Sequence, residues 1–299
     1  MKPPAFEYHR PATVAEALAA LAEVGHDGKV LAGGQSLVPL LNMRLAAPAH
    51  LVDINRLAEL AYVRTTQDAV RVGAVARHAE VEHDAAARGA VPLLAQALAQ
   101  LAHPTIRNRG TVVGSLVHAD PAGELPAVLA LLGGVVEVAA AGNGGGRAVP
   151  AAEFFVGPLE SALRPGELAT AAVFPRPPAG SGSAWVEVAR RAGDYALCGV
   201  GALVTLDPDR RVRAARAALC SVGPAPVTVD LGDALAGRPH DAADWAAAGA
   251  LAAARVDPDG DIHASAAYRR HLAGVLTARA ARAAAANAAA GPDGQGGTA

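Results

Sequence analysis

The residues at positions 32–37 have the composition of a ligand-binding turn. Their sequence, Ala-Gly-Gly-Gln-Ser-Leu, follows a short apolar run and precedes leucines at helical spacing. A Gly-Gly pair between a strand and a helix lets the backbone approach a ligand closely, and amides at the start of the following helix favour a phosphate. A tight turn without a ligand has the same local sequence, so this segment alone is a weak signal.

A second polar segment combines hydroxyls, a glycine and acids. Thr111, Gly114 and Ser115 are followed by the carboxylates of Asp120 and Glu124, which precede an apolar run. Hydroxyls and amides suit contacts to a pyrophosphate, and carboxylates accept hydrogen bonds from ribityl or ribose hydroxyls. An ordinary polar loop is the alternative interpretation.

Several other chemistries lack the residue patterns that they need. The sequence has no Gly-x-Gly-x-x-Gly fingerprint in a strand–helix–strand unit, no Walker A lysine and no Gly-x-Ser-x-Gly elbow. Rossmann dinucleotide binding, P-loop nucleotide binding and serine hydrolysis are therefore disfavoured. The ten histidines form no His-Glu-x-x-His pair and no close cluster along the sequence, so no metal site is expected within the chain. His78 and His118 are expected to form hydrogen bonds at helix ends or in loops.

The cysteine content limits the redox chemistry of the chain itself. Cys198 and Cys220 are too few for a zinc finger or for four-thiolate ligation of an iron–sulfur cluster, so any such cluster must lie on a partner. We expect both thiols to be reduced and buried, as in a cytoplasmic protein, with a disulfide as the alternative.

Length and composition indicate a globular protein of two domains. The chain has 299 residues, 52% of them hydrophobic, and its formal net charge of -2 provides no positive field for nucleic acid. No window reaches the roughly 18 uninterrupted apolar residues of a membrane span, and the N-terminus has no apolar signal region. We therefore expect a soluble, cytoplasmic protein without a transmembrane segment or a nucleic-acid partner.

The elements that must hold the two polar segments alternate between helix and strand. A capping box of Thr13 and Glu16 begins a predicted helix over residues 13–24, which ends before Gly25. Hydrophobic spacing and turn residues predict the following further elements of this half: a strand at 30–32, a helix from 37 to 48, a strand at 51–54, a hairpin of 62–65 with 70–75, helices at 79–88 and 92–102, an irregular stretch from 103 to 123, a buried helix at 125–132, strands at 135–138 and 169–174, and a flexible turn at 142–146.

A segment rich in proline, glycine and serine at 175–182 is the predicted linker to a second domain. Beyond it the sequence predicts three antiparallel strands at 184–190, 197–206 and 212–219, covered by alanine-rich helices at 241–255 and 265–287. The predicted domains are therefore 1–178 and 183–287, followed by a disordered tail at 288–299.

Taken together, the two polar segments resemble those of the FAD-binding medium subunit of the molybdenum hydroxylases, the family that includes aerobic carbon monoxide dehydrogenase and xanthine dehydrogenase. The resemblance covers nearly the whole chain, through ordered matches at 6–11, 32–37, 42–45, 53–55, 73–74, 106–111, 118–121, 154–158, 190–196 and 268–272. It implies an α+β fold class. An FAD-binding domain of the PCMH/VAO type, built from two small α/β subdomains, would precede a C-terminal domain with a three-stranded antiparallel sheet and helices.

The resemblance also assigns residues to noncovalently bound FAD: Ala32, Gly33, Gly34, Gln35, Ser36, Leu37, Thr111, Gly114, Ser115, His118, Asp120, Glu124 and Tyr195. Backbone amides of the first segment would wrap the diphosphate, and Thr111, Gly114 and Ser115 would complete the cradle. Asp120 and Glu124 would accept hydrogen bonds from cofactor hydroxyls, and Tyr195 would cover the isoalloxazine. No residue is expected to act as a nucleophile or a general acid.

One position departs from the family pattern. The usual Thr-x-Gly-Gly is here Thr-Val-Val-Gly, so that Val113 replaces a glycine. If this position requires a positive φ, Val113 is strained and FAD binding is altered.

The resemblance implies an oxidoreductase subunit that works in a complex. Substrate would be oxidised at a molybdenum-pterin centre on a large subunit. Electrons would pass through two iron–sulfur clusters, of the two-iron two-sulfur type, on a small subunit to the FAD of this chain and then to a quinone, NAD or oxygen. A dimer of heterotrimers in the cytoplasm is the expected assembly, with any attachment to the inner membrane made through partners. The substrate of the complex and its electron acceptor stay open.

Two other functions are kept as alternatives. A stand-alone flavin oxidase or dehydrogenase of the VAO-like fold would need a larger second domain with its own substrate cavity, and often a covalent flavin link. A flavin-free assembly subunit is indicated only by Val113. A relative of benzoyl-CoA reductase with an additional cluster is disfavoured because cysteine is scarce.

Overall fold

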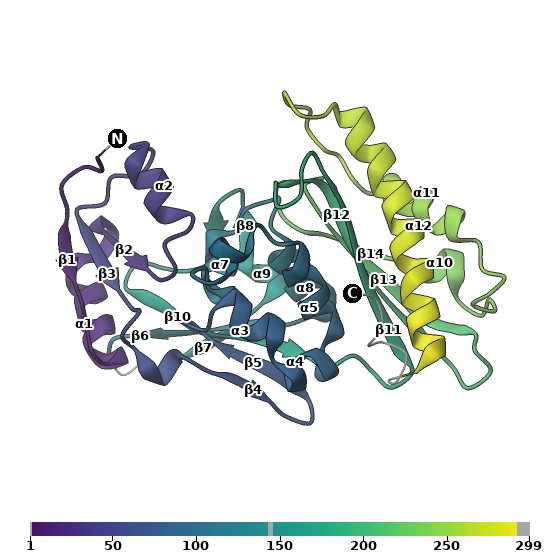
Figure 1. Ribbon diagram of the computed structural model, residues 1–299, viewed down its shortest axis with the longest axis horizontal. Helices are drawn as coiled ribbons and strands as arrows, with labels where there is room; N and C mark the ends of the chain where they lie inside the picture. The colour runs from purple at the N-terminus through teal and green to yellow at the C-terminus, as the bar shows by residue number, and fades with distance from the viewer. Residues whose placement is uncertain (1, 143–145, 292–299) are drawn as a thin grey trace.

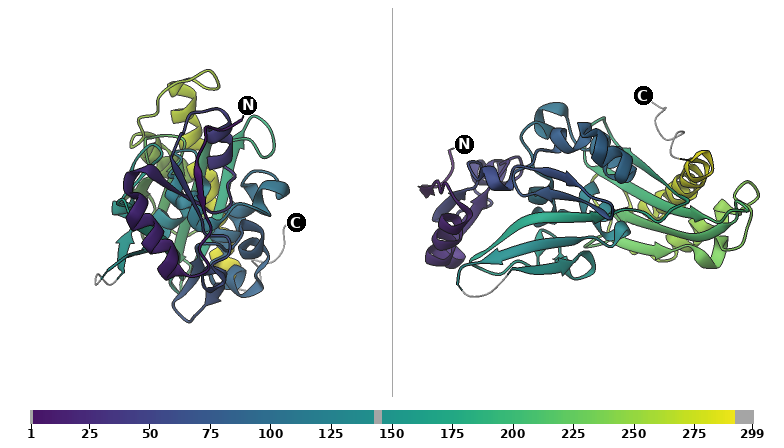
Figure 2. Two further views of the ribbon diagram at one scale, coloured as in Figure 1. Left: turned by 90° about the vertical axis from the view of Figure 1, so that its left-hand side faces the viewer. Right: turned by 90° about the horizontal axis from the view of Figure 1, so that it is seen from below.

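The computed structural model describes residues 2–142 and 146–291. Within them, three main sheets follow one another along the longest axis of the molecule, each with helices packed on it (Figure 1), and the view from below shows the same succession (Figure 2). The polypeptide runs from the first sheet through the second to the third.

The first sheet is small and parallel. Its strands are β1 (Glu7–His9), β2 (Gly28–Leu31) and β3 (His50–Asp53), in the order β1-β3-β2. Thr13 caps α1 (Val14–Val24) as predicted, because its hydroxyl accepts a hydrogen bond from the amide of Glu16 at 3.2 Å. The other half of the predicted capping box is shifted by one residue, since the carboxylate of Glu16 accepts from the amide of Ala12 at 2.7 Å. A short 3-10 helix, η1 (Gly25–Asp27), then leads into β2.

The helix after the first polar segment is shorter than predicted. The sequence pattern extended it to residue 48, but α2 (Leu37–Asn42) ends before Met43. The chain turns away at Arg44, whose φ of 59° is left-handed and cannot continue a helix. Leu45, which fits the helical spacing, is instead exposed.

The second sheet is antiparallel and has the order β4-β5-β10-β6-β7. Its strands are β4 (Val63–Thr65), β5 (Ala69–Gly73), β6 (Val135–Ala140), β7 (Arg147–Pro150) and β10 (Glu167–Pro175). The predicted hairpin is confirmed as β4 and β5, which follow the 3-10 helix η2 (Ala58–Leu60). β7 was not predicted, and residues 143–145 of the expected flexible turn lie outside the described residues.

Helices cover this sheet and connect it to the third one. They are α3 (His78–His83), α4 (Ala85–Ala90), α5 (Pro92–Gln100), α8 (Glu124–Leu132) and α9 (Ala151–Phe154), which precedes the small hairpin of β8 (Phe155–Gly157) and β9 (Glu160–Ser161). The single helix predicted at 79–88 is two helices, because Asp84 leaves the helical conformation. Its carboxylate caps α4 by accepting from the amide of Ala87 at 2.7 Å.

The stretch from 103 to 123 is not irregular as predicted. It contains α6 (Pro104–Arg107) and α7 (Val112–His118), and the hydroxyl of Thr111 caps α7. Polar residues and glycines obscured both helices in the sequence. Val113 lies inside α7 with its side chain in the core, so the expected strain at this position is absent. A helical valine needs no positive φ.

The third sheet is antiparallel and has four strands, where three were predicted. These are β11 (Ser181–Ala189), β12 (Ala196–Leu206), β13 (Val212–Cys220) and the additional edge strand β14 (Val227–Asp230). Every residue of β12 is buried, because α5 and α8 pack on one face of the sheet and α12 (Ala266–Ala290) packs on the other. The short edge strand had too few residues to show alternation in the sequence.

The alanine-rich helices of this region differ from their predicted limits. α10 (Gly232–Leu235) was not predicted, and α11 (Trp245–Ala253) is shorter than residues 241–255. α11 packs mainly on α12 rather than on the sheet. α12 continues to Ala290, so residues 288–290 are helical and not part of a disordered tail, whereas 292–299 lie outside the described residues.

Cys198 and Cys220 are free and buried, as predicted. Burial raises the pKa of the Cys198 thiol to about 12 and that of Cys220 well above its usual value, so both stay protonated. Among the described helices, none is long and apolar enough to cross a membrane.

Candidate functional site

The first polar segment connects β2 to α2 at the carboxyl end of the parallel sheet. Gly34 has a left-handed φ of 72° there. The backbone amides of Gly33, Gly34, Gln35 and Ser36 donate no hydrogen bond to any group in residues 2–142 and 146–291, and all four residues are half-buried. Backbone N–H groups require an acceptor, so this turn presents four donors to a partner from outside the chain.

The two polar segments are in direct backbone contact. A Cβ added at Gly33 would lie 2.4 Å from the carbonyl oxygen of Arg109 and 2.7 Å from the Cα of Gly110. Only glycine leaves room for this approach, because the groups that it meets are backbone atoms that cannot rotate away. The glycine in the first segment therefore allows the second segment to lie against it.

A chain of hydrogen bonds reinforces this contact. Arg77 donates to the carbonyl of Arg109 and to Oδ1 of Asn55, each at 2.7 Å, and Asn55 donates to the carbonyl of Ala32 at 2.7 Å. Partial burial is the main cause that lowers the pKa of Arg77. Arg77 gave no signal in the sequence, whereas Asn55 could have been noticed because it follows a parallel strand.

The hydroxyls of the second segment hold its conformation. Thr111, which is buried, accepts from the amide of Gly114 at 3.1 Å and begins α7. Ser115 lies one turn later, with Oγ 3.0 Å from Nε2 of His78. His78 is the first residue of α3, so its expected hydrogen bond at a helix end is confirmed. Its buried Nδ1 finds no acceptor within the described chain.

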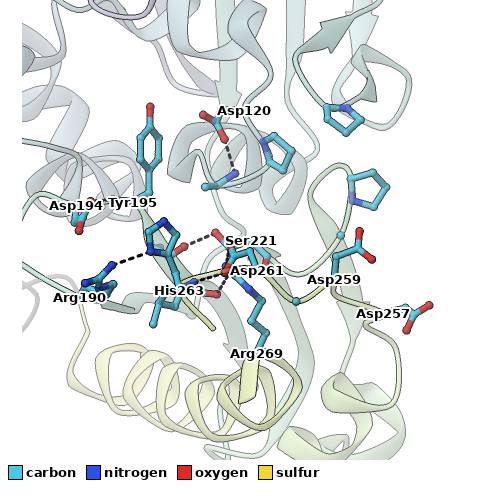
Figure 3. A pocket seen from close by; sticks show the side chains of 18 residues that line it. Asp120, Arg190, Asp194, Tyr195, Ser221, Asp257, Asp259, Asp261, His263 and Arg269 are labelled. Carbon is cyan, nitrogen blue, oxygen red and sulfur yellow. Dashed lines mark hydrogen bonds and ion pairs between the residues drawn. The ribbon is translucent and has the colours of Figure 1, made fainter. Parts of the chain in front are cut away.

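A pocket of about 420 Å³ lies between the loop that joins α7 to α8 and one end of the third sheet, and its wall includes Asp120 and Tyr195 (Figure 3). Tyr195 is 64% exposed, and its phenol has a raised pKa because of partial burial and the negative charges of Asp120 and Glu124. Nε2 of His118 lies 4.0 Å from the carboxylate of Asp120. Two of the predicted side chains, Asp120 and Tyr195, therefore line this pocket, and His118 lies beside Asp120.

The opposite wall of the pocket was missed by sequence reasoning. The guanidinium of Arg269 donates to the carbonyl of Leu197 at 2.7 Å, to that of Ser221 at 3.2 Å, and to the carboxylate of Asp261 at 2.8 Å (Figure 3). Arg269 is only 8% exposed. It fixes the loop before α12 against β12 and β13, and no local motif marks a cation that acts through such distant partners.

Glu124, which was expected to accept a hydrogen bond from a cofactor hydroxyl, is buried. It is 7% exposed, and burial raises the pKa of its carboxyl to about 8, with smaller contributions from the charges of Glu187 and Asp120. Glu187, which accepts from the indole N–H of Trp185 at 2.9 Å, has a raised pKa for the same main reason. Glu124 is therefore mostly protonated at neutral pH and can donate a hydrogen bond.

α7 connects the two parts of the site. Its N-terminal residues follow Gly110, which touches the first segment, and its C-terminal His118 lies beside Asp120 at the pocket. Seven helical residues span about 10 Å. The 32–37 turn and the pocket are thus separate regions, and the turn does not line the pocket.

Two family models match the chain. The model described as the FAD binding domain in molybdopterin dehydrogenase matches residues 4–177, and the model described as the CO dehydrogenase flavoprotein C-terminal domain matches residues 183–284. Together these two matches cover nearly all of the described chain.

Known proteins match over almost their whole length. The chain is 41% identical over 280 residues to the 6-hydroxypseudooxynicotine dehydrogenase complex subunit alpha of Paenarthrobacter nicotinovorans, which covers 93% of this chain and 94% of that protein. It is 36% identical over 282 residues to the carbon monoxide dehydrogenase medium chain of Afipia carboxidovorans, and this match covers 94% of this chain and 96% of that protein. The solved carbon monoxide dehydrogenase from Hydrogenophaga pseudoflava, in a form that lacks the Mo-pyranopterin moiety of its molybdenum cofactor, matches with a TM-score of 0.89 at 35% identity, covering 96% of this chain and 99% of that chain.

Proposed function

The chain belongs to the family of FAD-binding medium subunits of the molybdenum hydroxylases, which are oxidoreductases, and from this premise we propose that it is the FAD-carrying electron-transfer subunit of a multi-subunit enzyme. The observation that carries the proposal is the backbone contact of Gly33 with Arg109 and Gly110 beside four free amides. That arrangement has the donors and the lack of side chains that a diphosphate requires.

We assign the diphosphate of FAD to the amides of Gly33, Gly34, Gln35 and Ser36. These donors face no competing acceptor within the described chain. The positively charged Arg77 is connected to the turn by hydrogen bonds to Asn55 and to the carbonyl of Arg109. Oriented amides and a fixed cation favour an anionic group. Ala32 and Leu37 flank the turn on the side of β2 and of α2, respectively.

We assign the hydroxyl-bearing and ring portions of FAD to the far end of α7. Thr111, Gly114 and Ser115 lie at the start of this helix, His118 is its last residue, and Asp120 follows it at the pocket that contains Tyr195. An exposed phenol ring can cover an aromatic ligand, and Asp120 can accept a hydrogen bond from a hydroxyl. Glu124, with its raised pKa, would serve as a donor in this region rather than as the acceptor predicted.

Bound FAD would supply electron-transfer chemistry between a partner subunit and an external acceptor. The residues of this chain bind and orient the cofactor, and none needs to react. A large subunit with the molybdenum-pterin centre and a small subunit with the iron–sulfur clusters are the proposed partners, in a dimer of heterotrimers. The names of the relatives, a complex subunit and a medium chain, support such partners.

The flavin content of the full chain tests this proposal. The chain is purified alone and together with its neighbouring subunits, precipitated with acid, and analysed for released flavin. FAD in the supernatant is the expected result for noncovalent binding. If neither preparation retains flavin when FAD is added, the assembly-subunit alternative replaces this proposal, and turnover of a substrate without partners would favour the stand-alone oxidase.

A matched pair of glycine variants connects the flavin to the proposed cradle. Gly33→Ala forces a Cβ against the backbone of Arg109, whereas a Cβ at Gly89 in α4 meets no atom within 4 Å. We expect Gly33→Ala to lose FAD and Gly89→Ala to retain it. Circular dichroism and thermal unfolding of both variants separate loss of the cradle from loss of the fold.

A further inference from the structure

Three side chains with metal-ligand chemistry converge on the edge of the first sheet, away from the proposed FAD site. Glu7, His9 and His50 each offer one donor atom, and these atoms all lie within 4.8 Å of one another. We propose that Glu7, His9 and His50 form a binding site for one divalent transition-metal ion of the Zn²⁺ type, which ties the N-terminal edge strand to the sheet.

The sheet register brings the three donors to one face. β1 pairs with β3 in parallel, with Glu7 opposite His50 and His9 opposite Val52. Alternate residues of a strand point to the same face, so Glu7 and His9 project together, and His50 projects beside Glu7. Tyr8 points to the other face, where its hydroxyl bonds to the carboxylate of Asp53.

The observed separations fit a shared ion. Nε2 of His9 lies 3.0 Å from Nδ1 of His50, and Oε2 of Glu7 lies 3.6 Å from the same Nδ1. An ion about 2.0–2.1 Å from each of two donors separates them by about 3.0 Å at a right angle and about 3.4 Å at the tetrahedral angle. The three atoms therefore need only small side-chain movements to bind one ion.

The surroundings leave space for the remaining coordination positions. On its other side His50 pairs with Gly28, and the side chain of Val24 fills the position that a Cβ would take there, so the open side of the three donors is the exposed side of Glu7. The side chain of Glu7 is 76% exposed and that of His50 is 25% exposed. Water can therefore complete the coordination of an ion held by three protein ligands.

The donor set selects the type of ion. Two imidazoles and one carboxylate suit Zn²⁺, Ni²⁺, Co²⁺ and Cu²⁺, whereas Mg²⁺ and Ca²⁺ require oxygen ligands. The two histidines lie 41 residues apart in the chain, so no sequence motif connects them. His9 and His50 lie side by side in the fold, and the expectation that the chain has no metal site stays a prediction to which the proposed site is the alternative.

The position suggests a structural role for the ion. β1 has only three residues and pairs on one side only, so it contributes little stability by itself. One ligand from β3 and two ligands from β1 would link the two strands by coordinating the same ion. A hydrogen bond between the imidazoles with an ion pair from Glu7 to His50 is the alternative role, and metal titration distinguishes the two.

The experiment uses the full chain with any purification tag removed, titrated with ZnCl₂ and separately with MgCl₂ in a calorimeter. We expect one Zn²⁺ per chain, no Mg²⁺, and a higher unfolding temperature with Zn²⁺. His9→Gln and His50→Gln should each weaken Zn²⁺ binding at least about tenfold, since loss of even an outer-shell partner costs about 10–100-fold. His83→Gln, which changes an exposed histidine on α3, should bind like the wild type.

Unfolding of the ion-free variants shows whether His9→Gln and His50→Gln are folded before titration. Spectroscopy of the Co²⁺-substituted chain gives a second readout, because visible d–d absorption should be present in the wild type and lost in both variants. Absence of stoichiometric Zn²⁺ binding, or binding that both variants retain undiminished, overturns the proposal. FAD content is measured in parallel and should not change, which separates this site from the proposed cradle.

Discussion

Nε2 of His78 lies 3.0 Å from Oγ of Ser115, and this hydrogen bond joins α3 to α7 inside the protein. His78 is 3% exposed, and burial lowers the pKa of its imidazole to about 4 from an ordinary 6.5. The folded protein therefore holds a neutral histidine beneath the second polar segment. Protonation of this residue opposes the packing that positions Ser115.

Acid is predicted to destabilise the fold through His78. Between pH 6.5 and pH 4 the unfolded chain binds the proton more readily than the folded chain, so stability falls as the pH decreases through this window. The difference between the folded and unfolded pKa of His78 corresponds to a loss of roughly 3 kcal/mol in the free energy of unfolding. Urea unfolding at pH 7 and pH 4.5 measures the loss. His78→Gln should show a smaller loss, whereas His83→Gln, on the exposed side of α3, should show the full one; equal losses in both variants would contradict this prediction.

Glu124 is predicted to act in the opposite direction. Its folded pKa of about 8 exceeds the ordinary 4.5, so the folded chain binds more protons between these values and stability falls as the pH rises through them. Glu124→Gln removes this effect. As the pH rises from 5 to 8.5, the free energy of unfolding of this variant should increase by about 4 kcal/mol relative to that of the wild type. The exposed Glu153→Gln is the control. Denaturation midpoints measured at both pH values give the result, and a constant difference between wild type and Glu124→Gln would exclude the burial effect.

Arg77 is predicted to support FAD binding without being part of a reaction. Arg77→Gln removes a charge and at least one of the two hydrogen bonds to Arg109 and Asn55. A hydrogen bond from a charged group contributes about 1.5–3 kcal/mol, which corresponds to at least about a tenfold loss of FAD affinity. Fluorescence titration with FAD measures this loss. Arg88→Gln, on the exposed surface of α4, should bind FAD normally, and equal affinities for the two variants would remove Arg77 from the cradle.

Local patterns predicted those elements whose signals are local. The Thr13 cap, the hairpin of β4 and β5 and the buried helix α8 each follow from a few neighbouring residues, and all three are confirmed. α7 was missed because Gly114 and Ser115 are poor helix formers, and Thr111 was not recognised as its cap. The break at Asp84 was missed because aspartate can also occupy a helix interior.

The candidate site depends on contacts that a single sequence does not contain. Gly33 and Arg109 are 76 positions apart by number, and nothing near either residue indicates that they touch. The resemblance to a family identified both segments, but it gave no role to Arg77, or to Arg269 within the match at 268–272, because both act on backbone carbonyls from distant strands and loops. The burial of Glu124 likewise depends on the third sheet, which packs on α8.

Arg269 is predicted to hold the wall of the pocket in place. Its guanidinium satisfies the carbonyls of Leu197 and Ser221 and pairs with Oδ2 of Asp261, so Arg269→Met removes this donor from both carbonyls and leaves the carboxylate without its cation. Loss of a buried cation with such partners costs about 3 kcal/mol of folding free energy.

The neighbouring Arg270 provides a matched control for this prediction. Its side chain is 43% exposed and pairs with the fully exposed carboxylate of Asp257, so Arg270→Met should leave the stability of the fold unchanged. Hydrogen exchange of residues 257–263 adds a local readout, because the amides of His263 and Ala264 bond to the carboxylate of Asp261. We expect faster exchange there in Arg269→Met alone. If this loop exchanges at the wild-type rate in both variants, then the backbone turn and not Arg269 holds the pocket wall.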